Sequence, residues 1–416
     1  MPQIPNSLKL KSCPKNYTMG THRAVPPEKT LNWIKPKIPT IGITRIANIT
    51  GLDRVGIPVY SCVRPRAAEG AISVYSGKGI AEIHAEVSVI MEAVERYSAE
   101  VKSEDQKRII KGSFKELSSK FNALDPADLI IPFTTSYSQD APLRWIEGFD
   151  IIQDEKILVP VSAVFHPYLP SDDLHLFRTT TNGLASGNTV EEAVLHGLME
   201  VIERDAWSLT ELTKDEREVI RASEDCFLVK ELIDKFDRNE IRIVLKDITS
   251  DLGLPVIAAV SDDFRLMDPA LLTIGFGAHL DPEIAAIRAL TEVAQSRLTQ
   301  IQGAREDTYK ADFMRMFGYE RIKKINKHWF SDSKDFKEIR SMPNLSRRDI
   351  LDEIMLVISI LRKKGFEHVI VVDLTRKELE IPTLRVIVPG LEVYSLDMDR
   401  IGPRGRKLME EKSWKK

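Results

Sequence analysis

The fold of this chain is decided by the stretch AEVSVIMEAVER at residues 85–96, because two altered copies of it follow. The second copy reads AVLHGLMEVIER at residues 193–204, and the third reads AAIRALTEVAQS at residues 285–296. Copies this far apart do not form a solenoid, in which the period is about 20 to 50 residues. They predict three related helices inside one large fold.

Each copy is almost entirely apolar apart from a few matched polar positions. Two matched sets stand out, which are Glu92, Glu200 and Glu292 in the first and Glu95, Glu203 and Gln295 in the second. Residues three and four positions apart share a face of a helix, so the polar side chains of each copy form one stripe. A helix that is apolar nearly all round is buried on most of its surface. The stripes therefore predict a polar site inside the molecule.

The carboxylates of these stripes have two explanations. Two carboxylates on one buried stripe raise the free energy of the folded chain unless a cation compensates them. The first explanation is an ion-paired stripe, with Arg96 and Arg204 as the cations. The second is bound metal, which four glutamates in two matched helices favour, and ligands that are all oxygen suit Mg2+ better than Zn2+. The predicted metal ligands are Glu92, Glu95, Glu200 and Glu203.

The composition is ordinary for a globular protein and argues against several classes. With 416 residues, the chain can bury a sizeable core in one large domain or two. A formal net charge of −3 gives no sign of non-specific nucleic-acid binding. Its three cysteines have no paired spacing, which argues against a disulfide framework or a zinc site. Apolar runs are too short for a membrane span and no signal peptide is evident. We therefore expect a cytoplasmic protein that binds neither nucleic acid nor membrane.

The chain divides into four predicted parts. Residues 1–60 are expected to form an N-terminal arm and the first strands, and residues 61–304 the core that carries the repeats. Residues 305–348 are charged and aromatic and read as a helical insertion. Residues 349–416 are expected to close the domain as a strand-helix-strand part. Within the core, a strand, a glycine-containing loop and a helix recur three times, so the predicted fold class is mixed α/β (α+β).

The glycine-containing segments also have two explanations. Ser76-Gly77-Lys78-Gly79 lacks the Ser or Thr of the usual phosphate-loop pattern, and a Gly-Lys-Gly tripeptide alone is typical of a turn. Its place before the first glutamate helix favours phosphate binding, because backbone N–H groups collect at a helix start. In the second segment, Ser186 and Asn188 either face a phosphate or cap the next helix. Arg297 has either a phosphate or Glu292 as its partner.

No catalytic side chain can be identified from the sequence. The eight histidines make no metal-binding spacing, and His196, which aligns with Ser88, is more typical of a core histidine. No G-x-S-x-G elbow occurs and no cysteine has an evident histidine partner, so nucleophilic hydrolysis is poorly supported. The residues by themselves predict a site for Mg2+ and phosphate.

These motifs closely resemble those of the YcaO superfamily. The resemblance rests on Ser88-x3-Glu92-x2-Glu95-Arg96, on SGNTVEEAVLHGLMEVIERD at residues 186–205, and on FGAH…TEVAQSR. The segments GITR, TGLDRVGIPVY and VVDLT…VPGLE also match, so the resemblance covers most of the chain from Gly20 to Arg400. It implies a YcaO-type fold in which three related strand-loop-helix units surround a site for ATP and Mg2+.

The resemblance further implies which residues contact the nucleotide and what reaction follows. In this family, helix glutamates hold Mg2+ against the triphosphate without a phosphate loop. The nucleotide contacts expected on this basis and from the glycine-containing segments are Arg23, Thr30, Lys78, Ser88, Ser186, Asn188, Glu192, Arg204, Gln295 and Arg297. YcaO enzymes phosphorylate the oxygen of a peptide backbone amide, and a nucleophile then replaces that oxygen.

The chain looks most like the stand-alone archaeal YcaO members associated with methanogenesis. Their family role is thioamidation of a glycine in the alpha subunit of methyl-coenzyme M reductase, which gives thioglycine, often with a TfuA-type partner that manages sulfide. Azoline-forming members commonly end in a PxPxP tail, whereas this sequence ends PRGRKLMEEKSWKK, and no peptide-binding domain precedes the YcaO part. We therefore expect a thioamidase that cleaves ATP to ADP and phosphate.

Two alternatives to thioamidation stay open, namely an azoline-forming cyclodehydratase and a non-catalytic ATP-binding partner or regulator. Peptide recognition is expected in residues 105–180 and 305–348, where no motif identifies the substrate. Analogy with the family also indicates a homodimer.

Overall fold

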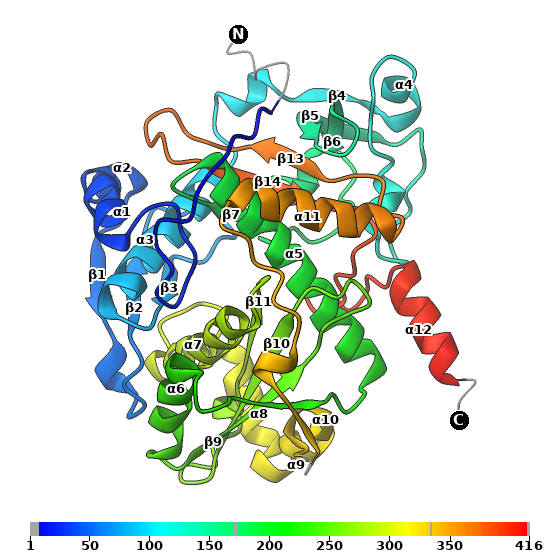
Figure 1. Cartoon of the computed structure of the whole chain (residues 1–416). Coiled ribbons are helices and arrows are strands. Elements are labelled where there is room, and N and C mark those ends of the chain that lie inside the picture. Colours follow the sequence, from blue (N-terminus) through cyan, green and yellow to red (C-terminus); the bar gives the residue numbers. More distant parts are fainter. Residues whose placement is uncertain (1–7, 170–172, 333–334, 414–416) are drawn as a thin grey trace.

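The computed structural model describes residues 8–169, 173–332 and 335–413, and in these residues three sheets form a mixed α/β architecture (Figure 1). The first sheet is antiparallel and consists of β1 (Arg45–Asn48), β2 (Val59–Val63) and β3 (Val74–Lys78). The second has the order β11 (Ile274–Ala278), β10 (Val256–Asp263), β9 (Ile241–Asp247), β8 (Val219–Arg221) and β12 (Phe336–Glu338). The third has the order β4 (Ile110–Ser113), β5 (Pro142–Asp150), β13 (Ile370–Asp373), β14 (Thr383–Ile387) and β7 (Leu184–Ser186), and β6 (Glu155–Pro160) also pairs with β5.

Helices of different lengths cover these sheets. Three long ones carry the repeated stretch, namely α3 (Glu82–Ala99), α5 (Val190–Thr213) and α7 (Pro282–Gln302). The others are α1 (Pro27–Ile34), α2 (Ile38–Ile41), α4 (Phe114–Ser118), α6 (Phe227–Asp237), α8 (Tyr309–Phe317), α9 (Tyr319–Ile325), α10 (Lys327–Phe330), α11 (Ile350–Lys363) and α12 (Pro403–Ser413).

Helices α5 and α11 lie between the two larger sheets, which gives the molecule its layers. Successive residues of a strand face opposite sides of the sheet. In β10, Val256, Ala258 and Val260 therefore join the core that contains α5, α11 and parts of β13 and β14. Their neighbours Ile257 and Ala259 join a second core with α6 and α7 on the other side of the sheet. Figure 1 shows this order, with α11 and α5 across the upper sheet and α6 and α7 below.

The three predicted units are confirmed as strand-helix pairs. Each of β3, β7 and β11 stands at the end of its sheet, and each leads directly into α3, α5 or α7. The first helix packs on the smallest sheet, and the third packs on β11 and β10. Three sheet edges therefore deliver three related helices to one region.

The predicted glycine loops are wrong in one respect, because half of their glycines lie in the strands themselves. Residues 76–78 belong to β3, and Gly275 and Gly277 belong to β11. A Cβ atom at Gly77 would lie 2.1 Å from the backbone nitrogen of Val89, and one at Gly277 would lie 2.1 Å from the carbonyl oxygen of Ala285. These glycines are required because the helix backbone packs directly against the strand.

The outer parts of the chain follow the predictions only in part. Residues 305–348 contain α8, α9 and α10, but they also contribute β12, which pairs with β8 in parallel and was not predicted. After residue 349, helix α11 comes first and the antiparallel strands β13 and β14 follow it, so the description strand-helix-strand gives the right kinds of element but not their order. A final helix, α12, was also not predicted.

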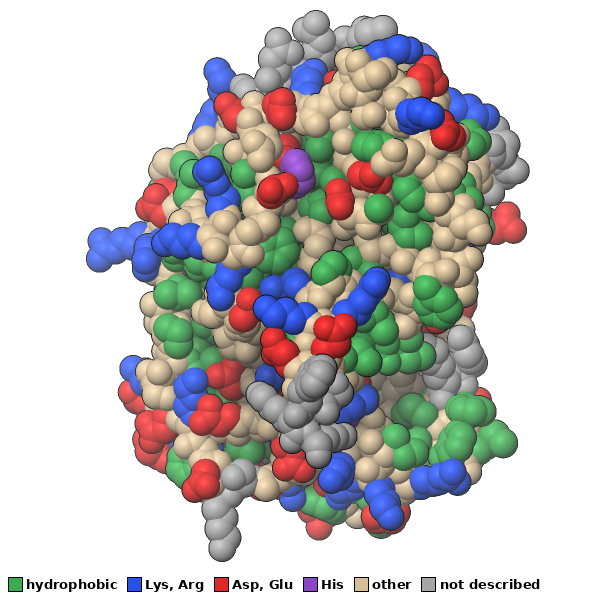
Figure 2. Space-filling view, turned by 90° about the vertical axis from the view of Figure 1, so that its right-hand side faces the viewer, with side chains coloured by type: hydrophobic (Ala, Val, Ile, Leu, Met, Phe, Trp, Pro, Cys, Tyr) green, Lys and Arg blue, Asp and Glu red, His purple; other side chains and the backbone are tan. Residues whose placement is uncertain are grey.

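The surface agrees with the modest net charge. Figure 2 shows one face of the molecule, on which positive and negative side chains are interspersed in the part of that face that the structure describes. Among the described residues, no helix is both long enough and apolar enough to cross a membrane.

Candidate functional site

The three repeated helices and the N-terminal arm line one cavity of about 580 Å3. The cavity contains every residue predicted to bind metal, which are Glu92, Glu95, Glu200 and Glu203. It also contains all but one of the predicted nucleotide contacts, namely Arg23, Thr30, Lys78, Ser88, Ser186, Asn188, Glu192, Arg204 and Gln295. The polar stripes of the three helices therefore face one another across a shared space.

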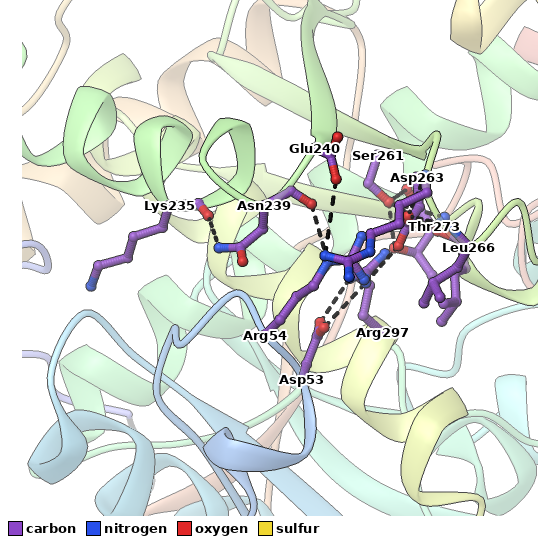
Figure 3. A network of polar contacts seen from close by, with 12 residues as sticks. Asp53, Arg54, Lys235, Asn239, Glu240, Ser261, Asp263, Leu266, Thr273 and Arg297 are labelled. Carbon is purple, nitrogen blue, oxygen red and sulfur yellow. Dashed lines mark hydrogen bonds and ion pairs between the residues drawn. The ribbon is translucent and has the colours of Figure 1, made fainter.

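Arg297 is the exception, and the structure corrects the prediction of a nucleotide contact there. Its side chain is fully buried and binds Asp53 at 2.8 Å and Asp263 at 3.0 Å, away from the cavity (Figure 3). Each residue of an α-helix turns about 100° from the last, so Arg297 points away from Gln295, two residues earlier. Asp263 also binds Arg54 at 2.7 Å, so the network ties the segment before β2 to β10 and α7.

One residue of each helix reaches the strand of the next unit, which closes the three units into a ring. Glu95 of α3 accepts hydrogen bonds from the backbone N–H of Ser186 at 2.9 Å and from its hydroxyl at 2.8 Å. Glu203 of α5 accepts one from the N–H of Ala278 in β11 at 3.0 Å. Gln295 of α7 donates one to the carbonyl of Ser76 in β3. These three side chains hold the cavity together as well as lining it.

The ion-paired explanation of the stripes holds for part of the site. Arg96 binds Glu92 at 3.0 Å, and Arg204 binds Glu203 at 3.4 Å. Within the described residues, no cation lies within ion-pair distance of Glu95 or Glu200, although Arg204 and Arg96 act on Glu200 from further away. Two of the four glutamates are thus left without a partner cation.

Glu95 and Glu200 show the electrostatic consequence of this arrangement. Burial, together with the charges of Glu200 and Glu92, raises the pKa of Glu95 to about 8, although the hydrogen bonds from Ser186 act in the opposite direction. Burial also raises the pKa of Glu200, with Glu203 adding to the effect and Arg204 opposing it. Buried carboxylates that repel one another favour a bound cation.

On the third helix, the matching glutamate, Glu292, has a partner cation. Lys78 of β3 forms an ion pair with Glu292, and the N–H of Phe276 donates to the same carboxylate at 3.4 Å. Burial disfavours the charge of Glu292, but Lys78 and Arg204 outweigh burial and lower its pKa. The sequence suggested Glu292 or a phosphate as the partner of Arg297. In the structure, Glu292 pairs with Lys78, and Arg297 pairs with Asp53 and Asp263.

The N-terminal arm is fastened to the start of α5 through Glu192. This carboxylate accepts hydrogen bonds from the N–H of Ala24 at 2.5 Å and from both the backbone and the side-chain amide of Asn188, at 2.7 and 2.8 Å. Thr30 donates to Asn188 at 2.7 Å, and Thr189 caps the helix by accepting from Glu192 N at 3.2 Å. The arm thereby brings Arg23 to the cavity, where burial lowers the pKa of Arg23 and Glu192 opposes the shift.

Sequence reasoning missed one basic residue that the repeat alignment could have found. Arg288 stands at the position of Ser88 and His196 in the third copy, and all three line the cavity. A nitrogen of Arg288 lies 3.4 Å from Nε2 of His196. Burial and then the charge of Arg288 hold the pKa of His196 well below its ordinary value, so this histidine is neutral.

The lining residues fit a bound nucleotide and its metal ion. Several of them carry a buried polar atom that has no hydrogen-bond partner, namely Oγ of Ser76, Nε of Arg96, Nε of Arg288 and Oε1 of Gln300. Arginine donors suit phosphate oxygens, and unpaired carboxylates suit Mg2+. Among the described residues, no three His, Cys, Asp or Glu side chains converge tightly enough to hold a metal by themselves. A metal here would therefore share its ligands with a phosphate, which is usual for Mg2+ in nucleotide sites.

Comparison with known proteins identifies relatives along most of the chain. The family pattern described as YcaO cyclodehydratase, ATP- and Mg2+-binding, matches residues 76–392. An uncharacterized protein of Methanothermobacter thermautotrophicus is 50% identical over 92% of this chain and 98% of its own length. A protein of Rhizobium leguminosarum bv. trifolii, described as lying in the tfuA 3′ region, is 34% identical over 89% of each chain.

Solved structures give the same result. The structure of YcaO from Methanopyrus kandleri bound with AMPPCP and Mg2+ matches with a TM-score of 0.78 and 30% identity, covering 94% of this chain and 98% of the other. A heterocyclase in complex with substrate and cofactor matches with a TM-score of 0.79 and 25% identity, covering 93% of this chain and 54% of the other. Both likenesses include the three strand-helix units, because they extend over almost the whole chain.

Proposed function

The chain belongs to the YcaO family of ATP- and Mg2+-dependent enzymes that modify peptide backbones, and we propose that it converts a backbone amide into a thioamide. The proposed target is a glycine of the alpha subunit of methyl-coenzyme M reductase, and sulfide is the proposed sulfur source. A TfuA-like protein is the proposed partner for sulfide supply.

The observation that carries the ATP-dependent part of the proposal is the pair Glu95 and Glu200. Both lie on the cavity wall without an ion pair among the described residues, and the pKa of each is raised by burial. Mg2+ bound to these carboxylates and to the triphosphate would neutralise charge on the phosphoryl oxygens. Hydrogen bonds from Ser186 hold Glu95 in place but do not balance its charge, and this lack of a partner cation favours a cation-binding role for both carboxylates.

The basic side chains of the cavity are suited to phosphoryl transfer. Arg23, Lys78, Arg96, Arg204 and Arg288 all line the cavity, so positive charge surrounds the space from the arm and from all three units. Such donors stabilise the charge that develops when a phosphoryl group moves. The chain thus supplies positioning and electrostatic stabilisation and needs no nucleophile of its own.

The proposed reaction balances without a side-chain base. The amide oxygen takes the terminal phosphoryl group of ATP, hydrosulfide adds to the amide carbon, and phosphate leaves with the former amide oxygen. The products are a thioamide, ADP and inorganic phosphate, and the proton of hydrosulfide ends on the phosphate. No redox partner is needed because oxygen and sulfur exchange at the same oxidation level.

The choice of sulfide as the nucleophile rests on the resemblance to stand-alone archaeal YcaO members, and two archaeal relatives match this chain over nearly their whole length. The archaeal proteins from Methanothermobacter thermautotrophicus and Methanopyrus kandleri each match over 98% of their own chains. The Rhizobium relative lies beside tfuA, which supports the proposed partner. The chain spans about half the length of the heterocyclase that it matches.

Azoline formation is the second candidate, because that heterocyclase and the description of the family pattern both name ring-forming chemistry. In this case a Cys, Ser or Thr side chain of the peptide would attack the amide carbon in place of sulfide. The two reactions share the phosphorylated amide, so the same cavity serves either one.

Intact mass spectrometry of a peptide distinguishes the candidates. A glycine-containing peptide of the reductase alpha subunit is incubated with this protein, ATP, Mg2+ and sulfide, with and without a TfuA-like protein. Exchange of one oxygen for sulfur, with matching phosphate release, is the expected result. Loss of one water from a Cys or Ser peptide would establish azoline formation instead. Unchanged peptides and no peptide-dependent phosphate release, even with the partner, would leave the ATP-binding regulator.

A further inference from the structure

A second, smaller cavity of about 80 Å3 lies behind the segment that leads into β7. Thr180 and Asn182 of this segment line the small cavity, whereas Thr181 and Leu184 line the large one. The two cavities therefore share a wall without sharing a site. The volume is sufficient for a small ion with some of its water, because a single water needs about 10 to 15 Å3.

Two buried arginines of the small cavity have no carboxylate partner. Arg385 of β14 is 2% exposed, and Arg400, which lies before α12, is 6% exposed. Within the described residues, neither guanidinium has an Asp or Glu oxygen within 4.0 Å, and Asp128 of the lining is itself solvent-exposed. Two uncompensated charges at one cavity are unfavourable unless a ligand balances them.

Backbone carbonyls hold both guanidinium groups in place. Arg385 donates to the carbonyls of Val164 at 2.9 Å, Asn182 at 2.7 Å and Thr180 at 3.1 Å. Arg400 donates to the carbonyls of residues 129 and 130 and lies over the ring of Phe177 at 4.0 Å. Carbonyl oxygens orient a guanidinium but carry no net charge. The two guanidinium groups are thus held in position, and a bound anion would balance their positive charge.

Two further observations point to a ligand. The side-chain oxygen of Asn182 is buried without a hydrogen-bond partner, and with the amide reversed the same atom position presents an N–H donor to the cavity. Burial lowers the pKa of Arg385 and that of Arg400 to about 10, and the charges of Glu200 and Asp397, respectively, oppose the shift without forming an ion pair.

We propose that this cavity binds a small inorganic anion between Arg385, Arg400 and Asn182. Hydrosulfide, as reactant, and phosphate, as product, share this chemistry, and naming these two sources rests on the proposed function. The binding itself does not, because none of the residues that line the small cavity also lines the large one.

Bromide localises the site independently of activity. In crystals of the full chain soaked in bromide, the expected result is an anomalous peak between Arg385 and Arg400. In solution, sulfide, phosphate and chloride are titrated at constant ionic strength and pH while heat of binding is measured, which separates the two sources. Absence of the peak together with absence of heat for all three ions would overturn the proposal.

Two variants test the residues. Asn182→Asp is nearly isosteric and places a built-in anion beside Arg385, so it is expected to raise the melting temperature and to remove anion binding. Arg400→Met is expected to weaken binding about tenfold or more. Arg406→Met removes the same charge from an exposed arginine of α12 outside the cavity and is the matched control. A lower melting temperature for Asn182→Asp, or equal loss of binding in the control, would contradict the site.

The failure of this proposal and that of the proposed function are distinguishable. A bromide peak with unchanged peptide mass would retain the anion site and remove thioamidation. An exchange of oxygen for sulfur in the peptide, with no bromide peak and no heat of anion binding, would support thioamidation and remove the anion site.

Discussion

Helices α3 and α5 differ from α7 in the charge that they bring to one cavity, although the three share a sequence pattern and a place after an edge strand. Glu95 and Glu200 have raised pKa values and no ion pair within the described residues. Glu292 has Lys78 as its partner and a lowered pKa. Gln295, a neutral amide, stands where the other two helices carry a glutamate.

The difference indicates that one repeated element serves two purposes. On the side formed by α3 and α5, which is the proposed metal side, Glu95 and Glu200 have no partner cation among the described residues. On the side formed by α7, Glu292 pairs with Lys78 of β3. All three helices follow an edge strand, so the two sides differ here in the side chains at matched positions. Substitutions that move charge between the two sides therefore test the comparison directly.

The largest effect is expected from Glu200→Gln on the metal side. Loss of one Mg2+ ligand should lower peptide-dependent phosphate release about a thousandfold, equivalent to about 4 kcal/mol. The fold should remain, because Glu200 has no ion pair to break and its repulsion of Glu95 is removed. Phosphate release and the melting temperature are measured together.

Glu86→Gln is the control for this change, since Glu86 is on α3, lies outside the cavity lining and pairs with Lys35 at 3.6 Å. Full turnover in Glu200→Gln would remove the metal assignment. A variant that fails to fold would return the stripe to the ion-paired explanation.

The next effect concerns the outer face of α7, which α3 and α5 do not match. Arg297→Met leaves Asp53 and Asp263 buried without their shared cation and should lower the free energy of unfolding by about 3 kcal/mol. The ATP affinity of the folded fraction should not change, because Arg297 does not line the cavity. Urea unfolding and nucleotide titration measure the two quantities, and a weaker ATP affinity with unchanged stability would restore the nucleotide contact.

A third change, Lys78→Met, gives the α7 side a carboxylate without a partner cation, as on the metal side. Lys78→Met leaves Glu292 without its cation, and since both side chains are about one-fifth exposed, the cost in stability should be about 2 kcal/mol. The freed carboxylate should also bind an additional Mn2+, counted by electron paramagnetic resonance. Adding Glu292→Gln should recover stability and remove the extra ion. If Lys78→Met gains no ion and loses no stability, the two sides do not differ in the way proposed.

The repeat made α3, α5, α7 and most of the cavity predictable, because aligned polar positions on mostly apolar helices have only one way to be buried together. The face of Arg297 could also have been worked out, since two residues beyond Gln295 is the wrong side of a helix. The position of Arg288 in the cavity lining could have been predicted from its alignment with Ser88 and His196.

Other features depend on tertiary contacts that no local pattern shows. Gly77 and Gly277 read as loop residues, yet they lie in strands because a helix backbone packs within van der Waals contact of them. The Lys78–Glu292 pair joins residues far apart in the chain and belongs to two different units. The strand β12 pairs with β8 across more than a hundred residues and has only three residues itself, too few for a periodic signal.

The smallest effect expected is the pH dependence of Mg2+ binding on the metal side. Mg2+ binds the ionised carboxylate, so a proton on Glu95 competes with it. Since the pKa of Glu95 is raised to about 8, Mg2+ affinity in the presence of AMPPCP should rise with pH up to about 8 and then level off. The rise should approach tenfold per pH unit below that value, or about 1.4 kcal/mol.

Calorimetry in buffers of different ionisation enthalpy should show one proton released near neutral pH, and Glu95→Gln should remove that release. The α7 side should contribute none, because the lowered pKa of Glu292 leaves it ionised throughout. A pH-independent affinity in the wild-type protein would mean that both sides are already neutralised, and the contrast between them would fail.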